Sequence, residues 1–331
     1  MLNHILHLSD KIFDPSLPQK PTRDGYGEGL LQAGEENQNV VALSADLTES
    51  TRAEAFAKKF PERFFECGVA EQNMATIAAG LGVAGKIVFI SSYATFSPGR
   101  NWEQIRTTIS YNDSNVKIAG HHAGISVGPD GATHQAIEDI ATMRVMANMK
   151  VFVPCDALEA KKATVAAAKI WGPVYLRFGR EKTPLFTTEA TPFQPGKAEI
   201  FWQGSKPQVV IISCGILLYN ALIAARDLEK EDKIGTIVLN CHTIKPIDEK
   251  EITALAKKTG AVVTVEEHQV MGGLGGAVAE VLAKHAPTPM EFVGMKDTFA
   301  ESGPPGALIE KYGMGVKDIK TAVKRVLRRR K

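Results

Sequence analysis

Cysteines are few in this sequence, and their spacing pairs none of them. Cys67, Cys155, Cys214 and Cys241 lie far apart without a CxxC pair, which argues against a zinc ribbon and against a secreted disulfide scaffold. No segment approaches the apolar length of a membrane span, and the first twenty residues have no basic start. We therefore predict a protein of the reducing cytoplasm, with neither export nor membrane association.

An excess of either charge is also missing. The 39 lysines and arginines are balanced by 37 aspartates and glutamates, and the two signs are mixed along the chain. This composition gives no reason to predict a nucleic acid partner. A basic stretch at 324–331 contains no aromatic residue for base stacking, and a solvated helix end explains it better because cations favour helix C-termini.

The chain is long enough to bury a substantial core. It has 331 residues, 44% of them hydrophobic, and its length suggests two domains. Strand and helix patterns alternate along it, which predicts an α/β fold of two doubly wound domains with mostly parallel sheets covered on both faces. We predict an arm over 1–20, a first domain over 21–185, a proline- and threonine-rich linker over 186–205 and a smaller second domain over 206–331.

The stretch from Arg63 to Arg106 contains the most informative carboxylate, that of Glu71. The spacing of a buried helical stripe is formed by Ala70, Met74, Ile77, Ala78 and Leu81. Glu71 lies at the edge of this stripe in the first helical turn, so we expect it to be at least half buried. An acidic residue there also complements the helix dipole, and the pattern alone favours that plain explanation.

Loops at 44–51, 93–100 and 121–134 each follow a predicted strand. The carboxyl ends of parallel strands meet at one edge of the sheet, where ligands bind in open α/β folds. Asp46 lies at such an end, although an aspartate in a turn is commonly just a cap.

The third loop contains a polar cluster of His121, His122, Asp130 and His134, which has four interpretations. The cluster offers metal ligands, but its spacing matches no zinc motif. A catalytic triad would need a nucleophile on a sharp strand-to-helix turn, and Ser126 is not in the GxSxG motif that forms such a turn. A plain turn at Asp130 and a set of hydrogen-bonding groups around a polar substrate are about equally favoured by the pattern alone.

Four motifs, in a fixed order along the chain, resemble those of a known protein family. CGVAEQNM, SSYATF, GPDGATHQ and NMKVFVPCDALEA together resemble the pyrimidine-binding and C-terminal domains of transketolase, over about residues 20 to 331. GRNWEQIR makes the chain most similar to the split form, in which the enzyme consists of two separate chains.

The resemblance implies a thiamine diphosphate site. Glu71 matches the glutamate that contacts N1′ of the aminopyrimidine, where a donated proton favours the imino tautomer whose nitrogen removes the C2 proton of the thiazolium. Tyr93 and Phe96 match the aromatic residues that stack on the pyrimidine, although phenylalanine is usual at the first position. Asp46 matches a residue near the thiamine ring.

The resemblance also implies sugar phosphate contacts. His134 and Asp130 match groups that hold the sugar hydroxyls, with His134 joining Glu71 as a catalytic residue. The phosphate ligands of the family are matched by Arg23, Ser50, His122 and Arg180. Arginine forks bind oxyanions in a bidentate way, which suits this role, and a charge at a helix entry is the second explanation for Arg23.

The family's GDG motif with its downstream asparagine, which holds the diphosphate and the metal, is missing here. The resemblance therefore implies an N-terminal partner chain that supplies the Mg²⁺ or Ca²⁺ ligands, no metal ligand from this chain, and an assembly of two copies of each chain.

The implied activity is transfer of a two-carbon ketol unit between phosphorylated ketose and aldose sugars. Rival interpretations are a 1-deoxyxylulose-5-phosphate synthase, a 2-oxo acid dehydrogenase β chain, a non-catalytic regulatory or scaffold subunit, and a metal hydrolase built on the histidines.

Overall fold

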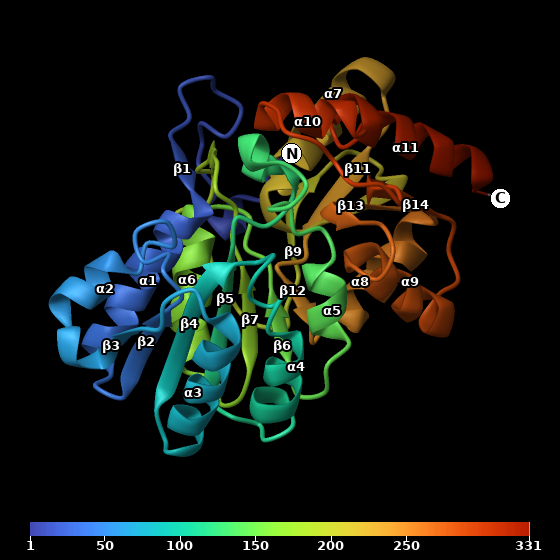
Figure 1. The fold of residues 1–331 in the computed structure, drawn as a ribbon. Helices are drawn as coiled ribbons and strands as arrows, with labels where there is room; N and C mark the ends of the chain where they lie inside the picture. The colour runs from blue at the N-terminus through green and yellow to red at the C-terminus, as the bar shows by residue number, and fades with distance from the viewer. Residues whose placement is uncertain (331) are drawn as a thin grey trace.

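The computed structural model describes residues 1–330, in which strands form two large sheets and one small one (Figure 1). The seven-stranded sheet has the order β12-β6-β7-β5-β4-β2-β3 and the five-stranded sheet the order β14-β13-β10-β11-β9, while β1 pairs with β8. The strands are β1 Gln19–Pro21, β2 Val40–Ser44, β3 Phe64–Glu66, β4 Ile87–Tyr93, β5 Val116–His121, β6 Lys150–Phe152, β7 Val174–Arg177, β8 Lys182–Pro184, β9 Glu199–Gln203, β10 Val209–Ser213, β11 Thr236–Asn240, β12 Thr243–Lys245, β13 Val262–Gln269 and β14 Met290–Met295.

Helices cover both large sheets. The α-helices are α1 Thr22–Glu36, α2 Glu54–Lys59, α3 Glu71–Val83, α4 Trp102–Gln104, α5 Asp139–Arg144, α6 Ala157–Ala168, α7 Leu218–Asp227, α8 Glu249–Thr259, α9 Leu274–His285, α10 Pro305–Lys311 and α11 Val316–Arg329. Among the described residues, no helix is long and apolar enough to cross a membrane.

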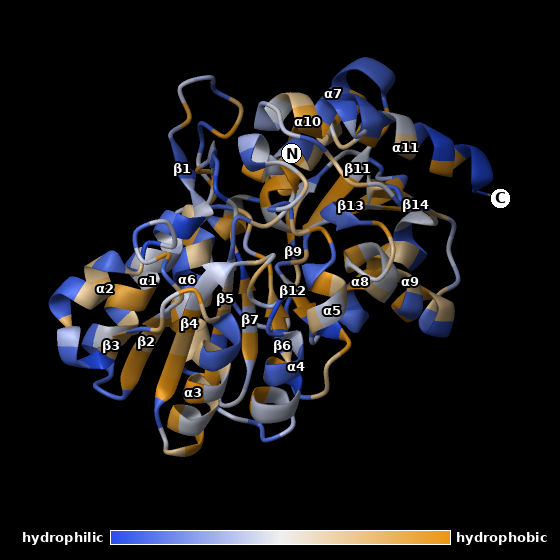
Figure 2. Ribbon diagram, viewed as in Figure 1, coloured by the Kyte–Doolittle hydropathy of each residue, from blue (hydrophilic) through white to orange (hydrophobic). Residues whose placement is uncertain are grey.

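The central strands explain why the sheets are parallel and covered on both faces. Every residue of β2, β5 and β10 is buried. Strands β2 and β10 are continuous runs of apolar or small residues without alternation, whereas β5 also buries Lys117 and His121. All pairings in the seven-stranded sheet are parallel except that of β12 with β6, and all in the five-stranded sheet are parallel except that of β9 with β11. Figure 2 shows the apolar strands enclosed between helices with polar outer faces, which confirms the predicted α/β fold class.

The two halves of the chain are interleaved more closely than their sequence order suggests. Strand β12 leaves the second half and pairs with β6 of the first sheet. The N-terminal residues Leu6, Ile12 and Leu17 are buried in the core cluster of the second sheet, so the predicted arm packs there. The segment 186–205, predicted as a linker, contains β9 at the edge of that sheet; the domain boundaries themselves remain a prediction.

One local expectation differs from the structure, and two short elements have no counterpart in the predicted pattern. Ile77, placed in the buried stripe of α3, is 41% exposed, because the buried face is formed by Met74, Ala75, Ala78 and Ala79 instead. After β4 the chain forms one turn of α-helix, α4, which continues into a π-helical segment, Ile105–Ser110. The short edge strand β3 was too brief to show a period in the sequence.

Candidate active site

The predicted site loops do meet at one edge of the seven-stranded sheet. They follow β2, β4 and β5, and Arg180 lies just after β7; these four strands are neighbours in parallel register, so their carboxyl ends lie together. Backbone hydrogen bonds join the loops directly: the Ala94 N–H donates to His121 O and the Ala123 N–H to Phe178 O. Helices α1 and α3 begin at this same edge and bring in Arg23 and Glu71.

Glu71 is the first residue of α3, and its side chain is only 2% exposed, as expected. One carboxylate oxygen, Oε2, accepts a hydrogen bond of 2.8 Å from Arg100 Nη1. The Asn101 amide donates to the Glu71 backbone carbonyl at 3.0 Å and ties the following loop to the helix start. Within residues 1–330 no group donates to Oε1, so half of a buried carboxylate is available to a ligand.

Two aromatic rings line the same space. The Tyr93 and Phe96 rings are nearly parallel, at 16°, with centroids 6.0 Å apart. The Arg100 guanidinium lies 4.9 Å from the Phe96 centroid while it pairs with Glu71, so a single arginine contacts both the aromatic residue and the carboxylate. The His134 ring meets the edge of Phe96 at 5.4 Å. These contacts join site residues of α3 and of the loops after β4 and β5 into one surface.

A cationic region adjoins the aromatic pair. The His122 ring stacks on Tyr93 at 3.8 Å, and its Nε2 lies 3.4 Å from Arg23 Nη1. Arg23 also donates to the Ser50 backbone carbonyl at 3.0 Å, while its buried Nε has no partner. Burial lowers the pKa of Arg23, and the charge of the neighbouring Arg52 adds to this effect. An anion bound here would accept a hydrogen bond from Arg23 Nε and would reduce the repulsion between Arg23 and Arg52.

The second pair of predicted substrate residues lies beside this region. Arg180 Nη1 donates to Val127 O at 2.8 Å and lies 3.4 Å from an Asp130 carboxylate oxygen. Both side chains are partly exposed. Their mutual contact keeps Asp130 on the loop after β5 facing the strand end that carries Arg180.

Asp46 is connected to the other site residues through Glu66. Its side chain is exposed, and its backbone adopts a left-handed conformation with φ of 59°. The Asp46 N–H donates to Glu66 at 2.7 Å, and the same carboxylate oxygen accepts the Gly68 N–H at 2.9 Å, so Glu66 connects the Asp46 loop to the segment that precedes Glu71. A left-handed backbone at a residue other than glycine is strained, and such strain is common at functional sites. Arg52 and His122 also adopt the left-handed conformation.

Sequence reasoning missed Arg100, Arg52 and Glu66. Arg100 stands four residues after Phe96, the spacing of neighbours on a helical turn, and this was the one signal that could have identified it. The contacts of Arg52 and Glu66 join segments far apart in the chain and leave no local pattern.

Of the other interpretations of the histidine cluster, the turn is present, since the Gly131 N–H donates to Gly128 O at 3.2 Å and the His134 N–H to Gly131 O at 3.0 Å. Residues 1–330 contain no group of three or more His, Cys, Asp or Glu side chains that could hold a metal ion. The His121 ring points to the far side of β5, where it contacts Tyr26 and Phe178. His121 therefore lies behind the site rather than in it.

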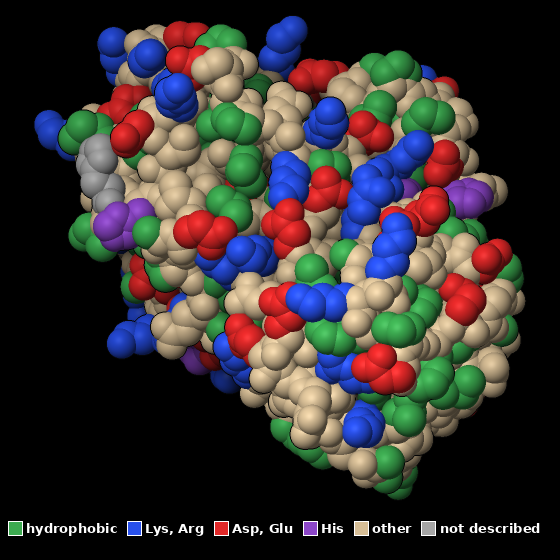
Figure 3. All heavy atoms as spheres, turned by 90° about the vertical axis from the view of Figure 1, so that its left-hand side faces the viewer, with side chains coloured by type: hydrophobic (Ala, Val, Ile, Leu, Met, Phe, Trp, Pro, Cys, Tyr) green, Lys and Arg blue, Asp and Glu red, His purple; other side chains and the backbone are tan. Residues whose placement is uncertain are grey.

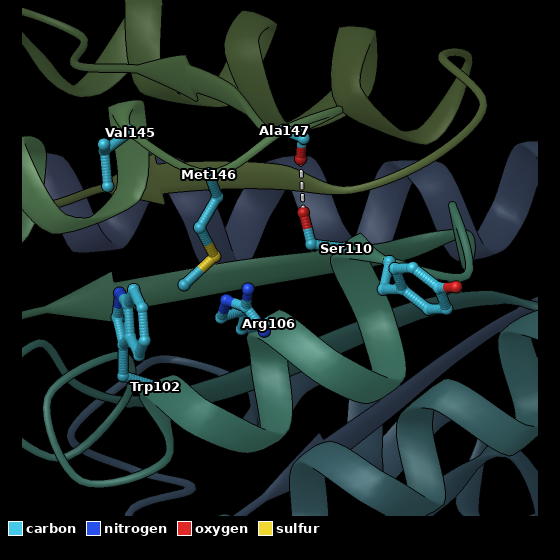
Figure 4. Close-up of a pocket in the computed structure, with 7 residues that line it drawn as sticks. Trp102, Arg106, Ser110, Val145, Met146 and Ala147 are labelled. Atoms are coloured by element: carbon cyan, nitrogen blue, oxygen red, sulfur yellow. Dashed lines mark hydrogen bonds between the residues drawn. The ribbon is translucent and has the colours of Figure 1, made fainter.

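Two cavities bear on the location of the site. One of about 220 Å³ lies between the loops after β4 and β5, lined in part by Thr95, Gln135 and Phe299, and so adjoins the predicted residues. The other cavity, of about 290 Å³, is lined by residues of α4, of the π-helical segment after it and of the segment after α5, among them Trp102, Arg106 and Met146 (Figure 4). The second cavity offers an arginine and the Tyr111 hydroxyl but no carboxylate or imidazole, and none of the predicted site residues lines it.

The surface around the entrance to α1 has no single sign of charge. Figure 3 shows basic and acidic side chains interspersed over the face that lies at the left of Figure 1. Ion pairs such as Lys20 with Glu28 and Arg52 with Asp24 neutralise much of this charge. Arg23 differs because it has no carboxylate partner within the described residues.

Protonation of His122 gives a test of how closely the cationic region is packed. Burial, and next the charge of Arg23, lower the pKa of His122 to about 3. Below about pH 6.5 the unfolded chain takes up a proton that the folded chain does not. The free energy of unfolding therefore decreases by about 1.4 kcal/mol for each unit by which the pH is lowered. Urea unfolding at pH 6.5 and 4.5 should therefore show a loss that is about 2 kcal/mol larger for wild type than for His122→Asn. Equal losses in both proteins would contradict this environment.

The residues present fit thiamine diphosphate at its pyrimidine end. A buried carboxylate with one free oxygen suits a ring nitrogen, and nearly parallel aromatic rings suit a flat heterocycle. The fit requires the Arg100 guanidinium to share or leave the Glu71 carboxylate, because it now occupies the other oxygen.

The chain is similar to known proteins over most of its length. The family model of the transketolase pyrimidine-binding domain matches residues 19–184, and that of the transketolase C-terminal domain matches residues 196–319. The chain is 45% identical to a putative transketolase C-terminal section of Methanocaldococcus jannaschii, over 93% of this chain and 96% of that protein. It is 35% identical to the transketolase of Homo sapiens, over 94% of this chain but 50% of that protein.

A solved structure described as a split gene transketolase, inactive β4 tetramer, superposes with a TM-score of 0.87 at 47% identity. The match covers 94% of this chain and 99% of that one. The family's domains imply dependence on thiamine diphosphate. The chain therefore belongs to the transketolase family and contains its pyrimidine-binding and C-terminal domains.

Proposed function

We propose that this chain is the C-terminal subunit of a two-chain transketolase, which transfers a two-carbon ketol unit between phosphorylated ketose and aldose sugars. The observation that carries the proposal is the half-occupied, buried Glu71 carboxylate beside the Tyr93 and Phe96 rings. When bound, thiamine diphosphate supplies the carbon nucleophile that attacks the donor carbonyl.

The chain's own residues then have distinct tasks. Glu71 holds a proton at the pyrimidine nitrogen, and the Tyr93 and Phe96 rings bind the flat ring and exclude water from it. His134, in contact with the edge of Phe96, binds a sugar hydroxyl close to the reacting carbon, as Asp130 does further along the loop. Asp46 lies near the thiamine ring.

The donor phosphate is bound by the cationic region. Arg23 and Arg180 supply guanidinium donors, Ser50 a hydroxyl, and His122 a neutral imidazole N–H. Arg23 comes from the start of α1 and Arg180 from the segment after β7, so the two guanidinium groups would reach one anion from different elements.

The second chain supplies what this one lacks. No GDG motif with a downstream asparagine occurs in the sequence, so the diphosphate and its Mg²⁺ or Ca²⁺ need ligands from a partner. The human relative aligns with this chain over half of its own length, which leaves room for such a partner domain. We propose an assembly of two copies of each chain in the cytoplasm.

Cofactor binding tests the two-chain proposal. Calorimetric titration of this chain with thiamine diphosphate and Mg²⁺ should show no tight binding alone, and tight binding after addition of a chain that carries GDG and the asparagine. Tight binding by the isolated chain would refute the divided site. Release of carbon dioxide from pyruvate by the complex would favour a synthase or dehydrogenase over ketol transfer.

The phosphate assignment predicts a substrate-dependent effect of Arg23→Ala. A hydrogen bond to a charged group is worth about 1.5–3 kcal/mol, so the KM of a phosphorylated ketose should rise by about 10- to 100-fold. With an unphosphorylated ketose the variant and wild type should react equally well, and Lys20→Ala, which removes a cation paired with Glu28, serves as a control. An equal loss with both substrates would argue against a phosphate contact.

A further inference from the structure

The loop that carries Asp130 and His134 is supported mainly from the second half of the chain. The buried Glu267 carboxylate on β13 accepts the Ser126 backbone N–H at 2.6 Å. A Cβ on Gly124 would lie 2.3 Å from the Glu267 carboxyl carbon, so this stretch of backbone rests directly on the carboxylate. The residues thus joined are 141 positions apart in the sequence.

Other contacts between the halves reach the same loop further along. Gln135 donates to the backbone carbonyls of Ile125, at 3.3 Å, and Glu301, at 3.0 Å. A Cβ on Gly131 would lie 2.6 Å from the Ser302 hydroxyl. The loop is therefore held at its start, in its middle and at its end, and Asp130 and His134 lie between these points.

A buried carboxylate is a costly way to pack two domains. Its desolvation is unfavourable, and an apolar side chain of similar size would serve packing alone at least as well. What a carboxylate adds is a directional acceptor that fixes one backbone N–H, and a hydrogen bond to an ionised group is about twice as strong as a neutral one. Burial raises the pKa of Glu267, although the nearby Arg177 opposes this.

Arg177 connects the carboxylate's own backbone to the loop. Its Nη2 donates to the Glu267 carbonyl at 2.9 Å and to the Ala136 carbonyl at 3.2 Å. Strand β13 and the end of the loop therefore share one buried donor. A displacement of β13 would move both ends of the loop together.

We propose that Glu267 is a positioning residue for the substrate: through Ser126 it holds the loop so that Asp130 and His134 meet the sugar hydroxyls. The C-terminal half thereby forms part of the active-site framework. This inference rests on the proposed function, because the sugar contacts belong to it. A loop displaced by a fraction of an ångström loses contacts that depend on orientation.

Two variants and a matched control test the inference. Glu267→Met removes the acceptor, and Glu267→Gln keeps an oxygen for the Ser126 N–H. Glu159→Met is the control, because Glu159 is also a buried carboxyl group that bridges the two halves, accepting from Asn240 at 2.7 Å, but none of its hydrogen bonds within residues 1–330 reaches the loop.

The first measurement is hydrogen exchange in the full chain without substrate. In Glu267→Met, exchange at the Ser126 amide should accelerate by about tenfold or more, in line with the loss of a hydrogen bond to a charged group. Exchange in Glu267→Gln and Glu159→Met should stay near wild type. Wild-type protection of Ser126 in Glu267→Met would overturn the inference.

The second measurement is steady-state kinetics of the two-chain complex. The donor KM should rise by about tenfold in Glu267→Met with a smaller change in kcat, recover in Glu267→Gln, and be unchanged in Glu159→Met. Equal KM changes in Glu267→Met and Glu159→Met would reduce Glu267 to general packing and overturn the inference. An inactive wild-type complex would overturn the proposed function alone, since exchange at Ser126 is read without turnover.

Discussion

Replacing Glu71 by Gln is expected to lower ketol-transfer turnover by about 10²–10⁴-fold, the usual contribution of a positioned acid or base. Glutamine has nearly the same shape and keeps an oxygen for Arg100, so the contacts of the buried position are retained. The amide has no acidic proton to hold at a ring nitrogen, and the proposed task of Glu71 is therefore lost. The measurement is kcat of the reconstituted complex with saturating thiamine diphosphate.

A matched control distinguishes the loss of the Glu71 acid from the loss of its ion pair with Arg100. Glu280 also pairs with an arginine, Arg144 at 2.6 Å, but its side chain is 67% exposed and remote from the site loops. Glu280→Gln should leave kcat unchanged. An unaltered unfolding midpoint in Glu71→Gln would show that the loss is chemical, and wild-type turnover in that variant would sink the assignment of Glu71.

Removing the Asp139 carboxylate is expected to cost about 3–5 kcal/mol of stability, since it leaves a buried cation without its partner. Asp139 accepts from Arg177 Nε at 2.7 Å and from the Tyr175 hydroxyl at 2.6 Å. The side chains of Asp139 and Arg177 are 2% and 6% exposed. Urea unfolding of Asp139→Ala at pH 7 measures the effect. A loss below about 1 kcal/mol would mean that the guanidinium finds other partners.

Two further measurements sharpen this prediction. Burial alone would raise the pKa of Asp139, but the Arg177 guanidinium and the hydrogen bonds lower it below its ordinary value. The stabilisation is thus present above the unfolded pKa of about 3.9 and is lost as the pH falls through the lower folded value. The double variant Asp139→Leu with Arg177→Met should recover only part of the loss, because it removes the unpartnered guanidinium but also takes the neighbouring cation away from Glu267.

Much of the candidate site could be predicted because its residues lie where periodic segments end. Tyr93 closes a buried strand and Glu71 opens a helix, so the edge of the sheet that they share follows from the β-α alternation. The expected burial of Ile77 was wrong because the small residues of α3 allow more than one apolar face, and packing against the sheet selected another. The roles of the site residues remain a proposal.

The α/β class and the parallel sheets could be predicted from the sequence, since strand burial and helix spacing are local properties of the chain. The link to transketolase came from the resemblance of four motifs. The folded chain was needed to see that Arg100 occupies half of the Glu71 carboxylate, that β12 crosses to the first sheet, and that Glu267 supports Ser126. The physical reason is that such contacts depend on side-chain directions and on how two separately patterned halves dock, and no local period encodes either.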